Sequence, residues 1–187
     1  LRENKVMSLK TRFGNLGNIL DFNNLTEENI YVLNSPILTN NQFEKFVSFF
    51  DKNNKTIDCT FKSDEDIESK LNSIKQEAEI YVRQGVTQII LSDKNVSKEN
   101  YPVPMLLCIG AVHTHLTKMK LRGYVSINVQ TGEALDTHSF ATLIGVGATT
   151  VNPYLALDSL YQRFEKKLFG KFLYEECVER YVKSVNL

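Results

Sequence analysis

The sequence of 187 residues contains 22 basic and 22 acidic residues, so its formal net charge is zero. With 42% hydrophobic and 24% charged residues it has the composition of a globular protein, which excludes a disordered chain. The balanced charge gives no indication of a nucleic-acid or anionic-membrane surface, and it favours small molecules or proteins as partners. The length suffices for one substantial core but hardly for two ordinary domains.

The cysteine pattern and the absence of long apolar runs indicate the compartment. Cys59, Cys108 and Cys177 are widely spaced and form no C-x-x-C pair, which suits free thiols and excludes a zinc or iron–sulfur site built from cysteine alone. No apolar run approaches the about 18 residues that a transmembrane helix needs, and the first ten residues lack the apolar region of a signal peptide. We therefore expect a cytoplasmic protein, or a plastid one in a eukaryote. Because the sequence does not begin with Met, we expect a piece of a longer chain.

The first 55 residues predict an irregular wrap followed by one short helix. Residues 1–39 are rich in turn formers, and only 30–33 suggest a brief extended piece. Asn40 is placed to cap a helix over 41–50, in which phenylalanines recur at helical spacing. We expect this helix to pack on a core.

From Thr56 onward the pattern alternates between strand and helix. Apolar residues with a period of two, or in short buried runs, predict strands at 56–61, 87–91, 124–129 and from 149. Apolar residues three and four apart predict helices between them, one capped by Ser63 and ended by Gly85 and one from about Met105 to Lys120.

This alternation predicts an α/β fold with a parallel sheet, since parallel strands joined by helices have right-handed crossovers. About four such units over 56–154, without closure, suggest an incomplete (β/α) barrel-like domain. Residues 155–187 carry two amphipathic stripes and predict a helical end. We expect residues 1–187 to form a single domain.

Polar residues follow the strands at their carboxyl ends, where α/β sheets place their ligands. Asp93 follows the second predicted strand, and Thr131 and Glu133 follow the third, just before the helix that His138 opens. One hypothesis is a free-standing β/α enzyme with its site at Asp93, Glu133 and His138. The alternative is structural, because polar and acidic residues at a helix start satisfy free N–H groups and the helix dipole.

The other candidate groups favour structural roles. His113 and His115 are two residues apart on a predicted helix, so they point to opposite sides and cannot hold one metal ion; we expect one to be packed against a loop and the other near solvent. Gly145 and Gly147 follow a helix and precede a strand, the wrong order for a dinucleotide loop. Cys59 and Cys108 lie in apolar surroundings and are expected in the core.

Several separated segments identify the family. The sequence resembles the central domain of the large, glutamine-dependent chain of glutamate synthase, in that family's order and over nearly its whole length. The matching segments are LRENKVMSL, FGNLGNIL, NSPILTN, DCTF, ILSD, PVPMLLCIGAVHTHL and TGEALDTHSFATLIGVGATTVNPYLAL.

The resemblance implies a parent chain that makes glutamate from glutamine and 2-oxoglutarate, in glutamate biosynthesis and ammonia assimilation. In that family an amidotransferase domain releases ammonia, an internal tunnel carries it, and an FMN-binding domain with an iron–sulfur cluster reduces the imine. The family's amidotransferase nucleophile and its flavin and cluster segments lie outside this sequence. The resemblance therefore implies no catalytic residue, cofactor or metal site within these residues, and an inactive fragment.

The resemblance also implies a role and partners. The central domain would join the amidotransferase and FMN-binding domains and contribute to the wall of the ammonia tunnel, with a reductase subunit or ferredoxin as a partner of the parent. In the segment VMSLKT, the residues Met7, Ser8 and Thr11 are the candidates for the ammonia path or an interdomain contact. The alternatives are that Met7 and Leu9 only pack this segment, or that the domain is a purely structural assembly module.

Overall fold

The computed structural model describes residues 9–14 and 30–186, and the chain divides into two compact units, 1–36 and 37–187. In the first unit, strands β1 (Thr11–Phe13) and β2 (Tyr31–Leu33) pair antiparallel. The predicted extended piece at 30–33 contains β2. The first strand, β1, was not predicted from the sequence.

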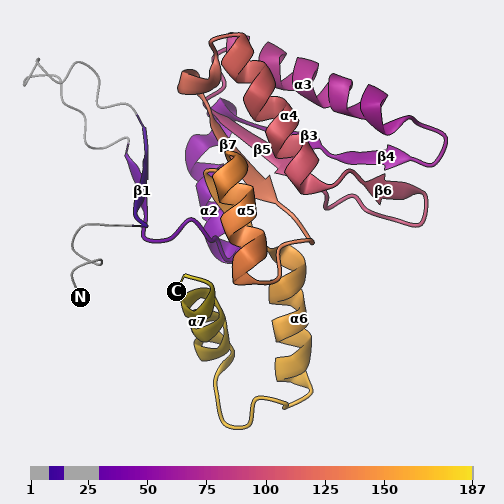
Figure 1. Ribbon diagram of the computed structural model, residues 1–187. Coiled ribbons are helices and arrows are strands. Elements are labelled where there is room, and N and C mark those ends of the chain that lie inside the picture. The colour runs from indigo at the N-terminus through magenta and orange to yellow at the C-terminus, as the bar shows by residue number, and fades with distance from the viewer. Residues whose placement is uncertain (1–8, 15–29, 187) are drawn as a thin grey trace, which may run out of the picture. The chain divides into compact units, whose positions relative to one another are not determined.

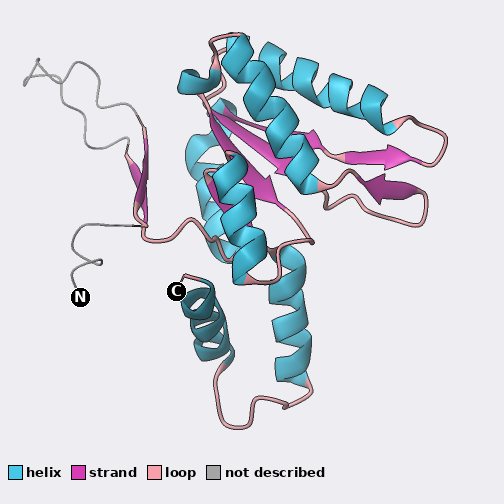
Figure 2. Ribbon diagram, viewed as in Figure 1, coloured by secondary structure: helices cyan, strands magenta, loops and turns pink. Residues whose placement is uncertain are grey.

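A four-stranded parallel sheet organises the second unit (Figures 1 and 2). Its strands follow chain order: β3 (Asn54–Asp58), β5 (Gln88–Ser92), β7 (Ser126–Gln130) and β8 (Thr150–Asn152). The α/β class and the parallel sheet are confirmed. Among the described residues the sheet is open, with β3 at one edge and β8 at the other.

Three helices between the strands cover one face of this sheet: α3 (Ile67–Arg83), α4 (Met105–Lys118) and α5 (Thr137–Val146). Figure 1 shows them side by side, α4 between α3 and α5. They share a face because each crossover advances to the next strand in the same direction and with the same hand. The cap of α3 is Asp66, which accepts the Ser69 N–H, rather than the predicted Ser63.

The main core lies between these helices and the sheet. One row of side chains crosses all four strands, because Ile57 pairs with Leu91, Leu91 with Val129, and Val129 with Val151. All four are fully buried. The helices contribute Ile74, Ala78, Val82, Met105, Cys108, Ile109, Val112, Leu116, Phe140 and Leu143.

The opposite face of the sheet is covered by α2 (Asn40–Phe50). The side chain of Asn54, on the face of β3 away from α3, donates to the Val47 carbonyl at 2.9 Å. Phe43, Phe46 and Phe50 of α2 are buried. The predicted helix is confirmed, but its cap is Thr39, which forms a capping box with Gln42.

The predicted strand 56–61 is wrong in one respect, because it is two strands, β3 and β4 (Thr60–Lys62). The chain changes its partner at Cys59, whose N–H donates to the Ser92 carbonyl at the end of β5 and whose carbonyl accepts the Val103 N–H. The Asp58 carboxylate accepts both the N–H and the hydroxyl of Thr60. The strand β4 then pairs antiparallel with β6 (Asn100–Pro102), which was not predicted from the sequence.

Two helices end the chain, α6 (Tyr154–Glu165) and α7 (Tyr174–Val185), as predicted. The last helix returns toward α5, and the Tyr181 hydroxyl donates to the Leu135 carbonyl at 3.2 Å. Burial raises the pKa of Tyr181 to about 12. Two short 3₁₀ turns, η2 (Asp51–Asn53) and η3 (Arg122–Tyr124), each precede a strand. Within the described ranges, no helix is long and apolar enough to cross a membrane.

Candidate functional site

The cluster at the carboxyl edge of the sheet is centred on Asp93, which follows β5 and is 2% exposed. Its carboxylate accepts hydrogen bonds from the Thr131 hydroxyl and from the Gly132 N–H, both in the loop after β7. The hydroxyl of Tyr154, the first residue of α6, donates to the same carboxylate; burial and this nearby negative charge raise the pKa of Tyr154. Asp93 therefore ties the ends of β5 and β7 to the start of α6.

Glu133 lies in the same loop and caps a different helix. Its carboxylate accepts the N–H of Met105, the first residue of α4, at 3.1 Å. Pro104, at the N-cap position, provides no side-chain cap, so Glu133 satisfies an N–H that the helix leaves free. Burial and the nearby charge of Asp93 raise the pKa of Glu133. The hydrogen bond from Met105 lowers it, but the net effect is a raised pKa.

Gly132 lies in close contact with Tyr154. A Cβ atom at this position would lie 3.1 Å from the Tyr154 hydroxyl oxygen and 3.4 Å from Leu155. A larger residue would require the Tyr154 side chain to shift by a few tenths of an ångström. The loop and the start of α6 are therefore fitted to one another.

His138 does not join this cluster. It is exposed in the first turn of α5, and none of the hydrogen bonds among Asp93, Thr131 and Glu133 involves it. Asp136 caps α5 by accepting the Ser139 N–H and hydroxyl, and these bonds lower the pKa of Asp136. Of the three residues of the enzyme hypothesis, the structure brings Asp93 and Glu133 to one cluster and leaves His138 outside it.

The face of the sheet under α2 carries a buried row of uncharged polar side chains. The Asn128 amide donates to the Gln88 side-chain oxygen at 3.0 Å and accepts from the Thr150 hydroxyl at 2.7 Å. Asn128 and Thr150 are fully buried, and Gln88 is 3% exposed. This row links β5, β7 and β8 through side chains as well as through the backbone.

A second polar row lies nearer the carboxyl edge. The Ser92 hydroxyl donates to the Gln130 side-chain oxygen at 2.9 Å, and the Gln130 amide donates to the Asn152 side chain at 3.3 Å. Asn152 then donates to the Asn40 side chain and to the Leu38 carbonyl, both at 3.0 Å. The row thus joins three strands to the start of α2.

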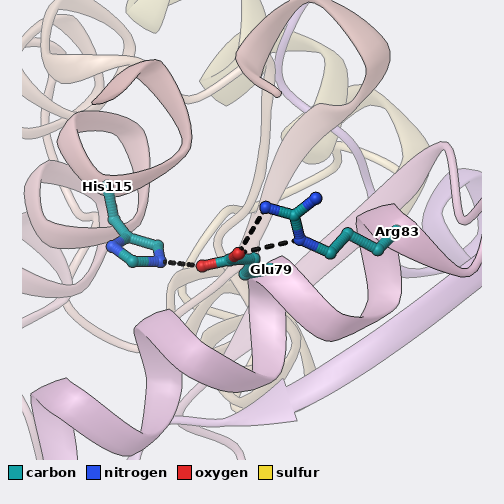
Figure 3. Close-up of polar contacts among 3 residues, drawn as sticks. All are labelled: Glu79, Arg83 and His115. Carbon is teal, nitrogen blue, oxygen red and sulfur yellow. Dashed lines mark hydrogen bonds and ion pairs between the residues drawn. The ribbon is translucent and has the colours of Figure 1, made fainter. Parts of the chain in front are cut away.

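The two histidines of α4 have separate partners, which agrees with their predicted opposite directions. The Nε2 atom of His115 lies 2.6 Å from a Glu79 carboxylate oxygen, and Arg83 binds the other oxygen at 2.7 Å (Figure 3). Hydrogen bonds from Arg83 and His115 lower the pKa of Glu79. His115 is therefore partly buried against α3, where the sequence suggested that one of the two would be near solvent.

His113 contacts the loop between α4 and β7, as was predicted for one histidine of the pair. Its Nδ1 atom accepts from Arg122 Nε at 3.1 Å, while the same guanidinium donates to the Val125 and Gly147 carbonyls. Gly147 has a φ of 131° and its missing Cβ would lie 2.6 Å from His113 Nδ1, so glycine is required there.

Cys59 and Cys108 belong to the core, as predicted. Cys59, Cys108 and Cys177 are all buried and free. A hydrogen bond with the Cys108 thiol, together with burial, raises the pKa of Cys59, which disfavours the reactive thiolate. In the described part of the chain no three His, Cys, Asp or Glu side chains come together as a metal site would require.

The candidates for the ammonia path lie in the first unit. Met7 and Ser8 fall outside the described residues. Thr11 is the first residue of β1 and pairs with Leu33 of β2.

These observations define an α/β domain whose parallel strands follow chain order and whose carboxyl edge is held by side-chain hydrogen bonds. The family model described as glutamate synthase central domain matches residues 1–187. The chain belongs to the glutamate synthase central domain family.

Individual relatives agree with this assignment. The glutamate synthase [NADPH] large chain of Azospirillum brasilense is 45% identical over 189 residues, which cover 100% of this chain and 12% of the relative. The corresponding large chain of Bacillus subtilis (strain 168) is 39% identical over 190 residues, with the same coverage. The chloroplastic ferredoxin-dependent glutamate synthase of Spinacia oleracea is 37% identical over 175 residues, or 87% of this chain and 10% of the relative. The chain thus spans about an eighth of the two bacterial relatives.

Two parts of the site were not predicted from the sequence. Tyr154 was placed at the end of the β/α units and given no role in the site, and its contact with Asp93 depends on residues 61 positions apart in the chain, which no local pattern reveals. The buried polar face of the sheet was not predicted. A signal was present, because Gln88, Asn128 and Thr150 are uncharged, whereas a solvated face usually includes lysine or glutamate.

Proposed function

We propose that this chain is the central connecting domain of a glutamate synthase whose parent chain is an oxidoreductase that makes glutamate from glutamine and 2-oxoglutarate. The match of the family model to residues 1–187 supports one domain over this whole range. In the parent the domain joins the amidotransferase and FMN-binding domains and contributes to the ammonia tunnel. FMN and the iron–sulfur cluster belong to the neighbouring regions, and a reductase subunit or ferredoxin supplies electrons.

The noncatalytic role is supported mainly by the hydrogen bonds that Asp93 and Glu133 accept at the carboxyl edge of the sheet. A catalytic acid or base needs a free position toward a substrate. Asp93 is instead buried and accepts from Thr131, Gly132 and Tyr154, and Glu133 caps α4. The groups that look catalytic in the sequence act here as ties between loops.

We infer that the domain is an incomplete barrel. Strands in chain order with all crossover helices on one face are the arrangement of a (β/α) barrel, whereas a doubly wound sheet reverses its strand order. The order β3-β5-β7-β8 supports this. At the β8 edge, Ile37 forms a parallel bridge with Val151, and the Leu38 N–H donates to the Val151 carbonyl at 2.9 Å, so the chain before α2 covers the place of a further strand.

The catalytic assignment can be tested by separating the domain from its neighbours. The purified domain should show no glutaminase activity and no flavin absorbance, while the full-length chain prepared in parallel shows both. Stoichiometric FMN binding by the domain alone would overturn the proposal.

The tunnel contribution can be tested at Thr11 in the full-length chain. If the Thr11 hydroxyl lies on the ammonia path, Thr11→Val should increase the glutamine hydrolysed per glutamate formed, because more ammonia escapes. The rate of glutamine hydrolysis should not fall. Thr114→Val, at an exposed threonine of α4, is the matched control and should leave the ratio unchanged. An unchanged ratio in Thr11→Val would favour the purely structural assembly role.

A further inference from the structure

A hollow of about 330 Å³ lies beside the second polar row, at the carboxyl edge of the sheet and under α2. It is lined by Asn40, Phe43, Glu44, Val47, Ser48, Lys94, Gln130 and Asn152. Its size falls at the lower end of small-molecule sites, and its position is the one where α/β sheets place ligands. Neither Asp93 nor Glu133 lines it, so it is distinct from the cluster that ties the loops together.

One wall of the hollow comes from α2, and its residues are set by helical spacing. Asn40, Glu44 and Ser48 are four residues apart and therefore lie along one stripe of the helix. Phe43 and Val47, also four apart, form a parallel apolar stripe beside it. The wall thus offers a carboxylate, an amide and a hydroxyl next to an apolar surface.

The facing wall comes from the strand ends and carries hydrogen-bond donors. Lys94 follows Asp93 and supplies an ammonium group. The Gln130 amide has two N–H groups, and one of them donates to Asn152. The second has no partner among the described residues, and the same holds for the Asn40 amide nitrogen, whose side-chain oxygen accepts from Asn152.

The two charges of the hollow do not neutralise each other. Within residues 9–14 and 30–186, the ion pairs are Glu79 with Arg83 and Glu79 with His115, so neither Lys94 nor Glu44 is paired. A cation flanked by amide N–H donors is the environment that a carboxylate prefers, and an unpaired carboxylate on the other wall suits an ammonium group.

We propose that this hollow binds a free aliphatic α-amino acid in its zwitterionic form. The ligand's carboxylate meets Lys94 and the amide N–H groups of Gln130 and Asn40, and its ammonium meets Glu44. Its side chain lies against Phe43 and Val47. This proposal does not rest on the ammonia tunnel or on the connecting role proposed above.

The test is isothermal titration of the full-length chain with L-valine and with two analogues that each lack one charged group. Isovalerate keeps the carboxylate and the branched side chain, and isobutylamine keeps the ammonium and the same side chain. We expect saturable binding of L-valine and at least about tenfold weaker binding of either analogue, since each loses one charge-assisted contact. Equal affinity for L-valine and isovalerate would overturn the zwitterion assignment.

Substitutions locate the binding in this hollow. Lys94→Gln and Glu44→Gln, both at exposed positions, should each weaken L-valine binding about tenfold. The matched controls Lys98→Gln and Glu99→Gln, exposed and outside the hollow, should leave it unchanged. The absence of saturable L-valine binding, or identical affinity in all four variants, would overturn the proposal. Either result would leave the glutaminase and flavin tests unaffected.

Discussion

On the face of the sheet covered by α3, α4 and α5, Ile57, Leu91 and Val129 form an apolar row, whereas under α2 the strands carry Gln88 and Asn128, joined by a hydrogen bond. Both faces are buried at the two central strands. The apolar face is stabilised mainly by burial, which is not directional, and the polar face by bonds that need fixed partners. The polar face therefore specifies one position for each strand. An apolar substitution on this face leaves buried polar partners unsatisfied, whereas a smaller residue on the apolar face leaves a cavity.

The largest effect is expected on the apolar face. Ile127→Ala removes a fully buried side chain of β7 and leaves a cavity, so the free energy of unfolding should fall by about 2–5 kcal/mol. Urea unfolding followed by circular dichroism measures it. Ile80→Ala, at a 52% exposed position on α3, should change the free energy by less than about 0.5 kcal/mol. Equal losses in the two variants would contradict the assignment of this core.

The polar face should respond to single and combined changes differently. Asn128→Leu leaves Gln88 and the Thr150 hydroxyl without their buried partner and should cost about 1–3 kcal/mol. Replacing all three together, with Gln88→Leu and Thr150→Val added, removes the unsatisfied groups and should recover part of the loss. Losses that simply add in the triple variant would show that the row does not act as one network.

At the carboxyl edge, stability should depend more on the helix cap that Glu133 provides for α4 than on the charge of Glu133. Glu133→Ala removes the acceptor for the Met105 N–H and should cost about 1 kcal/mol. Glu133→Gln keeps an acceptor oxygen. Because the pKa of Glu133 is raised in the folded state, ionisation at neutral pH is unfavourable there, so this variant should be slightly more stable than the parent at pH 7.

The pH dependence of stability tests whether Glu133→Gln is more stable than the parent for the reason given. As pH falls below the ordinary pKa of a glutamate, about 4.3, Glu133 becomes protonated in both states, so the advantage of Glu133→Gln should disappear. Thermal unfolding of the two proteins at pH 7 and at acidic pH measures the difference. An advantage that grows as pH falls would contradict the raised pKa.

The smallest effect is expected at the surface contact between α3 and α4. The pKa of Glu79 is lowered by Arg83 and His115, so its contribution to stability is full above the ordinary glutamate pKa and is lost as pH falls through the lower folded value. Glu79→Gln should therefore be less stable than the parent at pH 7, and the gap should close in acid. Glu99→Gln, at an exposed loop residue, is the control.

The sequence predicted those parts of the fold that depend on local patterns. The four parallel strands and the long helices follow from apolar spacing within each segment. The division of 56–61 into two strands was missed because it depends on the change of partner at Cys59, which bonds to Ser92 and Val103 far along the chain. The strands β1 and β6 were missed because each is defined by pairing with a distant strand, β2 or β4, which no local pattern reveals.

The sequence placed three of the four strand-end residues together and left their role open, while His138 lies outside their cluster. Asp93, Thr131 and Glu133 do meet at the carboxyl edge, as polar residues after parallel strands should. Their partners, Tyr154 and Met105, are distant in the sequence, and only the folded chain shows that Asp93 contacts the first and Glu133 accepts from the second. Spacing alone therefore cannot separate a capping carboxylate from a catalytic one.

The most direct test of the central claim is the turnover of glutamate formation in the full-length chain carrying Glu133→Gln. The variant keeps the acceptor for the Met105 N–H and abolishes any proton transfer by this residue. A structural carboxylate predicts a kcat within about twofold of the parent, with glutaminase activity and FMN content unchanged. A loss of about 10² or more in kcat, in a chain that still binds FMN and hydrolyses glutamine, would show general acid–base catalysis and contradict the account.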